Sequence, residues 1–206
     1  MRKLLGILLL LVVATAAAYA DPVPVSVGPL TLPYGTIGPY YGDVTDPTGT
    51  SFQPLICFSE LNGLGAPWTG GLKYSINTVE AGTFGTWGLT TFQFNVLGYL
   101  ADQLFAAPGT ANLQHAIWYY AGFVPAGFFA SLPPAEQVEV TALIAAAEAA
   151  VKAGFVTGDY FLFAPNSSPG TGAQPLIERA PEPGSLLLLG SGIFGIAGAI
   201  RRKMAR

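Results

Sequence analysis

Two apolar segments flanked by basic residues occupy the ends of this 206-residue chain, and only the stretch between them is left to fold as a domain. Six of the nine basic residues lie in these ends, whereas residues 21–180 carry three basic and eleven acidic side chains and so a net charge of −8. A domain without a basic patch argues against binding to nucleic acid. The chain is therefore predicted to hold one acidic domain between two address segments.

The amino-terminal segment has the three parts of a secretory signal. A basic pair opens it, residues 4–13 are apolar, and Ala18 and Ala20 are the small residues of a cleavage site. The apolar run is shorter than the ~20 residues that a membrane-spanning helix needs. We predict that signal peptidase removes residues 1–20 and that the mature chain begins at Asp21.

The carboxyl-terminal segment combines a Pro-Glu-Pro triplet, an apolar stretch over residues 185–200 and a basic cluster. A helix of that length rises ~24 Å, which is less than the ~30 Å hydrocarbon core of a bilayer. It is therefore a weak stop-transfer segment, with its basic cluster held in the cytoplasm. The motif residues are Pro181, Glu182, Pro183, Arg201, Arg202 and Lys203.

This order of features over residues 181–206 closely resembles the PEP-CTERM sorting signal of Gram-negative bacteria. The resemblance implies that an exosortase, a membrane cysteine protease or transpeptidase, removes the tail. It also implies a producer that makes an extracellular polysaccharide matrix. The protein would be anchored transiently by its carboxyl-terminal helix and then reach the outer surface or the matrix. An ordinary tail anchor is the alternative.

The pattern of the central domain changes along the chain. Apolar runs and alternation predict strands first, helical spacing follows, and strands return at the end. This order predicts an α+β fold: a β-rich, sandwich-like or barrel-like domain with an inserted helical subdomain. We expect turns and short edge strands over residues 35–50, and residues 90–93 are ambiguous. The expected helices run approximately over residues 94–107, 111–121 and 134–152. The expected strands are 23–27, 55–58, 72–79, 160–163 and 174–177.

Cys57 is the one cysteine of the chain, so an internal disulfide is impossible. An exported protein meets an oxidising compartment, where cysteines usually pair. An unpaired cysteine in such a protein is either a small buried apolar residue or a reactive thiol. A reactive thiol would bond to another chain or to another group of the same chain. Its apolar neighbours Ile56 and Phe58 fit burial. On composition alone, the buried and the reactive interpretations both stay open.

A second segment, residues 113–118, places Gln114 and Trp118 one helical turn apart on one face. A buried amide needs hydrogen-bond partners. A cysteine thiolate that attacks the glutamine carbonyl instead expels ammonia and leaves an internal thioester, and close positioning makes this slow step feasible. Phe58 and Trp118 are expected to flank the product and keep water away from it, and His115 is a candidate for assisting proton transfer.

Residues 56–58 and 113–118 resemble, in order, the two motifs of bacterial surface thioester domains, and the likeness covers residues 51–177. The first motif is an aromatic residue or Leu, then Cys and an apolar residue; the second is apolar-Gln-x-x-apolar-Trp. The resemblance implies a cross-link between Cys57 and Gln114. It implies covalent capture of an amine or hydroxyl on a target surface, by a single-use binder rather than a turnover enzyme. Ile56 departs from the first motif, and the nearest following acidic residue is Glu60.

Two other functions stay open. Low charge and a 12% share of aromatic residues also suit a structural or carbohydrate-associated matrix protein without covalent chemistry. A cysteine hydrolase would need Cys57 and His115 within hydrogen-bond reach, and no orienting Asp or Asn motif accompanies them. No cofactor is indicated, and no His or Cys cluster has the spacing of a metal site. The carboxylates are scattered, with Asp43, Asp46 and Asp159 expected in turns.

Overall fold

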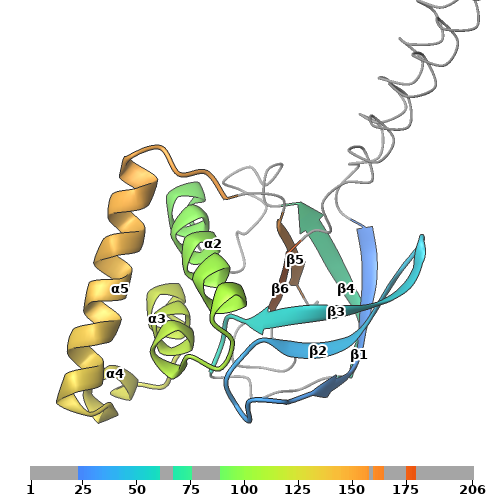
Figure 1. Ribbon diagram of the computed structural model, residues 1–206. Coiled ribbons are helices and arrows are strands. Elements are labelled where there is room, and N and C mark those ends of the chain that lie inside the picture. Colours follow the sequence, from blue (N-terminus) through green and yellow to red (C-terminus); the bar gives the residue numbers. More distant parts are fainter. Residues whose placement is uncertain (1–22, 61–66, 76–88, 158–159, 165–174, 180–206) are drawn as a thin grey trace, which may run out of the picture.

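The computed structural model describes residues 23–60, 67–75, 89–157, 160–164 and 175–179 (Figure 1). The predicted signal peptide with its cleavage site and the predicted sorting segment lie outside these ranges. Among the residues that are described, no helix is both long and apolar enough to cross a membrane. The predicted anchor helix over residues 185–200 is not among them.

Six antiparallel strands form a closed barrel in the order β1-β2-β3-β6-β5-β4, with β1 and β4 pairing to close it. The barrel-like option of the predicted α+β fold is therefore confirmed. The helices are inserted between β4 and β5 in the sequence, also as predicted. The strands are β1 Val23–Thr31, β2 Tyr40–Asp46, β3 Gly49–Cys57, β4 Trp68–Ser75, β5 Tyr160–Ala164 and β6 Leu176–Arg179.

The region expected to hold turns and short edge strands is instead a regular hairpin of β2 and β3. Its register runs without a break from Tyr40 opposite Leu55 to Asp46 opposite Gly49. Alternate β2 side chains, those of Tyr40 and Val44 among them, are buried inside the barrel, which is the pattern of a half-buried strand. The abundance of Gly, Tyr and Thr hid this alternation. Asp43, expected in a turn, lies within β2.

Local sequence signals explain the helices. Thr90 caps helix α2 (Thr91–Ala106) through a capping box with Gln93, which settles the ambiguous residues in favour of a helix start. Helix α3 (Ala111–Ala121) ends at Gly122, whose φ of 78° suits a residue without a Cβ atom. Helix α5 (Pro134–Lys152) starts with a proline at its first turn. A short helix, α4 (Phe128–Ser131), was not predicted.

Helices α2, α3 and α5 stack together on one side of the barrel (Figure 1). Successive side chains of the strands nearest to these helices point alternately into two apolar cores, one shared with the helices and one inside the barrel. Ile56 packs with the helices, whereas Leu55 and Cys57 belong to the core inside the barrel. Trp118 comes from helix α3 and yet packs in the barrel core. Helix α3 therefore contributes side chains to the end of the barrel where Cys57 lies.

Candidate functional site

Cys57 is the last residue of β3, beside Leu176 of β6, and its side chain is fully buried. The sulfur belongs to the core inside the barrel, because its strand neighbour Ile56 faces the helices. The thiol is free of any disulfide. The end of β3 thus fixes the cysteine at the junction of the barrel and the helical layer.

Gln114 lies on helix α3 and is also fully buried. Its side-chain Nε2 donates a hydrogen bond of 2.9 Å to the backbone carbonyl of Cys57. Its Oε1 accepts one of 3.2 Å from the backbone N–H of Gly38. Both ends of the amide are therefore partnered, as a buried polar group requires. The same two bonds hold the amide against the cysteine.

Trp118 lies one helical turn after Gln114 and shares its face. Its indole Nε1 donates to the sulfur of Cys57 across 3.0 Å. The phenol oxygen of Tyr40 lies 3.9 Å from the same sulfur, and the hydroxyl of Tyr40 donates to the Thr36 carbonyl. The structure thus brings together Cys57, Gln114 and Trp118, three residues that the sequence singled out.

Gly38 contacts the candidate site, and sequence reasoning missed it. A Cβ atom built on it would lie 2.7 Å from Oε1 of Gln114, which is closer than a real Cβ contact. A glycine here lets the backbone N–H approach the amide oxygen. Residues 38 and 114 are 76 positions apart, so no local sequence signal links them. Tyr40 was missed for the same reason.

Burial dominates the electrostatics of the sulfur. It raises the pKa of the Cys57 thiol to about 11, against the hydrogen bond that Trp118 donates to the sulfur and the one that joins the sulfur to Tyr40, both of which lower this pKa. Burial likewise raises the pKa of Tyr40 above its ordinary value. At neutral pH the group is therefore a thiol, and its proton must be removed in any reaction.

The structure places the other two predicted supporting residues differently: Phe58 packs in a different core from the sulfur, on the side of the helices, whereas His115 lies against Trp118. Phe58 packs in the helical core, where its ring is 6.4 Å from that of Phe94. The ring of His115 lies 5.8 Å from that of Trp118, and its Nδ1 is 3.6 Å from a carboxylate oxygen of Glu136. Burial lowers the pKa of His115, against the charge of Glu136. The histidine is therefore neutral at pH 7.

Glu60 adds negative charge near the site. Its Oε2 is buried and has no hydrogen-bond partner among the described residues. Its charge acts to raise the pKa values of both Cys57 and His115. In the described part of the chain, no group of three or more His, Cys, Asp or Glu residues could hold a metal ion. The contacts among Cys57, Gln114 and Trp118 support the chemistry of the thiol and the amide.

Residues 179–203 match the family model of the PEP-CTERM protein-sorting motif. No curated protein and no solved structure matches the chain significantly. The resemblance to thioester domains accordingly stays a prediction. The match confirms the predicted sorting signal, and with it an exported protein that exosortase sorts to the cell envelope.

Proposed function

We propose that the barrel domain of this exported, exosortase-sorted protein forms an internal thioester between Cys57 and Gln114 and attaches covalently to a target surface. The observation that carries the proposal is the pair of hydrogen bonds that hold the Gln114 amide, one of them to the carbonyl of Cys57 itself. The indole of Trp118, one helical turn after Gln114, donates a hydrogen bond to the sulfur. Cys57 and Gln114 are therefore neighbours in a fully buried site, which supports a reaction that depends on close positioning.

In the first step, the sulfur of Cys57 attacks Cδ of Gln114, and the C–N bond of the amide breaks. The nitrogen leaves as ammonia and takes up the thiol proton, so that atoms and charges balance. As the carbonyl carbon becomes tetrahedral, its oxygen gains negative charge. The backbone N–H of Gly38 already donates to that oxygen and stabilises the charge.

The raised pKa of the thiol makes this step slow at neutral pH, because little thiolate is present. Positioning compensates, since a fixed pair reacts with an effective concentration far above that of free groups. Because the reaction happens only once in each molecule, a slow rate is sufficient. Full burial of both residues then protects the thioester from water.

In the second step, an amine or hydroxyl on the target surface attacks the acyl carbon of Gln114. A new amide or ester bond forms, the C–S bond breaks, and the thiol of Cys57 is released with a proton. The protein is consumed by this transfer, which makes it a single-use binder. The neutral His115 lies against Trp118 and is a candidate to accept the proton of the incoming group.

The test is the intact mass of the full chain purified from its producing cells, with the processed ends identified from terminal peptides. We expect a deficit of one ammonia that disappears in Cys57→Ala and in Gln114→Ala. Gln103→Ala, on an exposed position of α2, is the matched control and should keep the deficit. Because the bond closes a loop between positions 57 apart, Cys57→Ala should also cost roughly 4 kcal/mol of stability. A mass without deficit and a Cys57 that is fully alkylated after denaturation would contradict the proposal.

A second candidate function is non-covalent binding to the carbohydrate of the matrix, and one surface feature favours it. Phe52 of β3 is 62% exposed, and its ring stacks with that of Tyr41 at 6.1 Å. Exposed aromatic faces of this kind pack against sugar rings. Retention on the producer's own exopolysaccharide should fall in Phe52→Ala and stay unchanged in Phe92→Ala on α2. Retention that depends on Cys57 would instead favour covalent attachment.

A further inference from the structure

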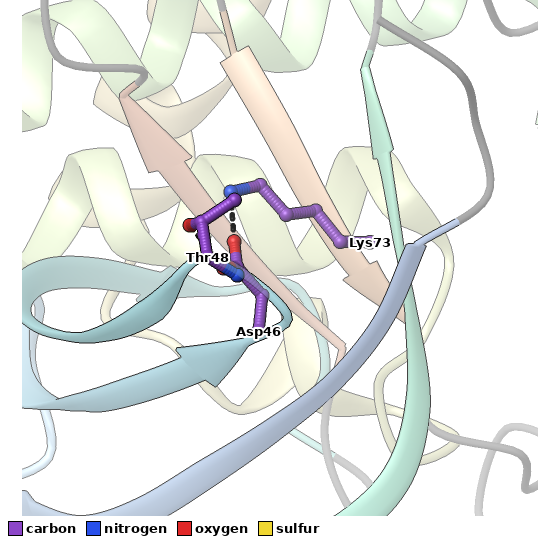
Figure 2. Close-up of polar contacts among 3 residues, drawn as sticks. All are labelled: Asp46, Thr48 and Lys73. Atoms are coloured by element: carbon purple, nitrogen blue, oxygen red, sulfur yellow. Dashed lines mark hydrogen bonds and ion pairs between the residues drawn. The ribbon is translucent and has the colours of Figure 1, made fainter. Parts of the chain in front are cut away.

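A second cluster of reactive groups lies in the barrel away from Cys57. Asp46 ends β2, Lys73 lies in β4, and Nζ of Lys73 is 3.0 Å from Oδ2 of Asp46 (Figure 2). Only 17% of the Lys73 side chain and 12% of the Asp46 side chain are exposed. Strand β1 lies between β2 and β4 in the barrel, so the pair joins strands that are not neighbours.

The two oxygens of Asp46 have different partners. Oδ1 accepts hydrogen bonds from the backbone N–H of Thr48 at 2.8 Å and from its hydroxyl at 2.5 Å, both within the turn that follows β2. Oδ2 faces the ammonium of Lys73 instead, as Figure 2 shows. Two donors on one oxygen form a small oxyanion site, and the other oxygen lies beside the amine.

Glu178 of β6 is a third charged group inside the barrel, with 2% of its surface exposed. Burial raises its pKa to about 7, and the charges of Lys73 and Asp46 also act on it, in opposite directions. A carboxyl group with this pKa accepts and donates protons near neutral pH. The ring of Phe163, the cross-strand partner of Lys73, lies 5.9 Å from Nζ and adds apolar surroundings.

We propose that Lys73 and Asp46 form an intramolecular isopeptide bond, with Glu178 as the proton carrier. No comparison and no sequence motif assigns such a modification to this chain, and it is independent of the thioester. It adds a covalent cross-link across the barrel of a protein whose single cysteine rules out an internal disulfide. The pair is 27 positions apart, so the bond would close a loop and restrict the unfolded chain.

The reaction starts from the ion pair. Burial raises the pKa of Asp46, but hydrogen bonds from Thr48 and Lys73 outweigh it and keep the pKa below its usual value. Nζ therefore first passes a proton to the ionised form of Glu178. Glu178 passes this proton on to Oδ2 of Asp46, the neutral amine attacks Cγ of the resulting carboxylic acid, and the negative charge that develops on Oδ1 is stabilised by the two donors of Thr48.

The C–Oδ2 bond breaks next, and Oδ2 leaves as water. Of its two protons, one comes through Glu178 and the other from the attacking nitrogen. An ammonium and a carboxylate thus become a neutral amide and one water, and Glu178 returns to its starting state. No oxidant, metal or cofactor enters the balance.

The experiment maps the peptides of the full-length secreted protein after reduction, denaturation and proteolysis. We expect the peptides that hold Asp46 and Lys73 to appear as one branched species, lighter by one water than their sum. The branched species should be lost in Lys73→Met and in Glu178→Gln. Lys152→Met, which removes an exposed ion pair with Glu148, is the matched control and should leave it intact.

The wild-type map needs no variant, so a variant that fails to fold does not obscure the result. Linear peptides with an unmodified Lys73 in the native protein would overturn the proposal. A branched species that persists in Glu178→Gln would overturn the role of Glu178. Loss of water and loss of ammonia differ in mass and reside in different peptides, so the isopeptide and the thioester succeed or fail separately.

Discussion

The two reactive clusters of the barrel, around Cys57 and around Lys73, differ in charge and in burial. Cys57, Gln114 and Trp118 are neutral and buried, and hydrogen bonds from Gln114 and Trp118 join Cys57 to helix α3. Asp46 and Lys73, as the ion pair that precedes any cross-link, are charged and retain some contact with solvent. The two clusters lie at opposite ends of β2: Tyr40, at its start, is near Cys57, and Asp46, at its end, is paired with Lys73. A neutral amide needs only hydrogen-bond partners to be buried, whereas desolvating a charge costs far more.

The largest effect is expected from removing the amide that links the helices to the barrel. In a Cys57→Ala background, where no thioester forms, Gln114→Leu keeps the approximate size of the side chain but leaves the carbonyl of residue 57 and the Gly38 N–H without partners in the protein interior. Two unpaired buried groups should lower the free energy of unfolding by about 4 kcal/mol. Chemical denaturation measures this. Gln103→Leu on the exposed face of α2 should change it by less than about 0.5 kcal/mol.

The charged cluster should instead show itself through pH. The pKa of Glu178 is about 7 in the folded protein against 4.5 for the free side chain, so between these values the folded state holds the extra proton. The contribution of Glu178 to stability is therefore greatest below pH 4.5 and falls as the pH rises to 7, by roughly 3 kcal/mol. Glu178→Gln should abolish this fall, as thermal unfolding at a series of pH values would show.

His115 serves as an internal check on that experiment, because its pKa is lowered in the folded state. Its contribution to stability appears as the pH rises, which is opposite to that of Glu178. The difference between the wild type and Glu178→Gln isolates the glutamate. An identical pH dependence in both proteins would mean that Glu178 is not the buried titrating group.

A smaller effect is expected at Gly38, where the change acts on geometry and removes no partner. In Gly38→Ala the new Cβ would lie 2.7 Å from Oε1 of Gln114, so the amide must shift. We expect a loss of about 2 kcal/mol in stability and slower loss of ammonia from freshly folded protein. Gly35→Ala is unsuitable as a control because its φ is positive, whereas Gly28→Ala meets its nearest atom only at 3.4 Å. Equal rates of ammonia release in Gly38→Ala and the wild type would contradict the role of the Gly38 N–H.

The helices could be predicted from the sequence because their signals are local. The capping pair of Thr90 and Gln93 and the αL glycine Gly122 mark helix ends within a few residues. The β2–β3 hairpin was missed because its burial pattern depends on a barrel that only distant strands complete. Tyr40 and Leu55 are paired across the sheet, and neither reveals this alone.

The residues of the candidate site likewise fall into those that local sequence patterns predict and those that only the tertiary structure brings together. Helical periodicity alone places Gln114 and Trp118 on one face, and the chemistry of a lone cysteine suggested their partner. The approach of Gly38 to Gln114 and of Lys73 to Asp46 depends on tertiary structure. Asp46 was expected in a turn, but it is the last residue of β2 and accepts hydrogen bonds from Thr48 in the turn that follows. Its second oxygen faces a strand that no sequence pattern connects to it.

The central claim is that the sulfur of Cys57 and the acyl group of Gln114 are joined, and a small amine tests it directly. The native protein is treated with methylamine and its peptides are then mapped. We predict that Gln114 becomes a methylamide while one thiol, that of Cys57, becomes available to alkylation. An unlabelled Gln114 that retains its amide nitrogen, beside a cysteine that was already a free thiol, would contradict the account.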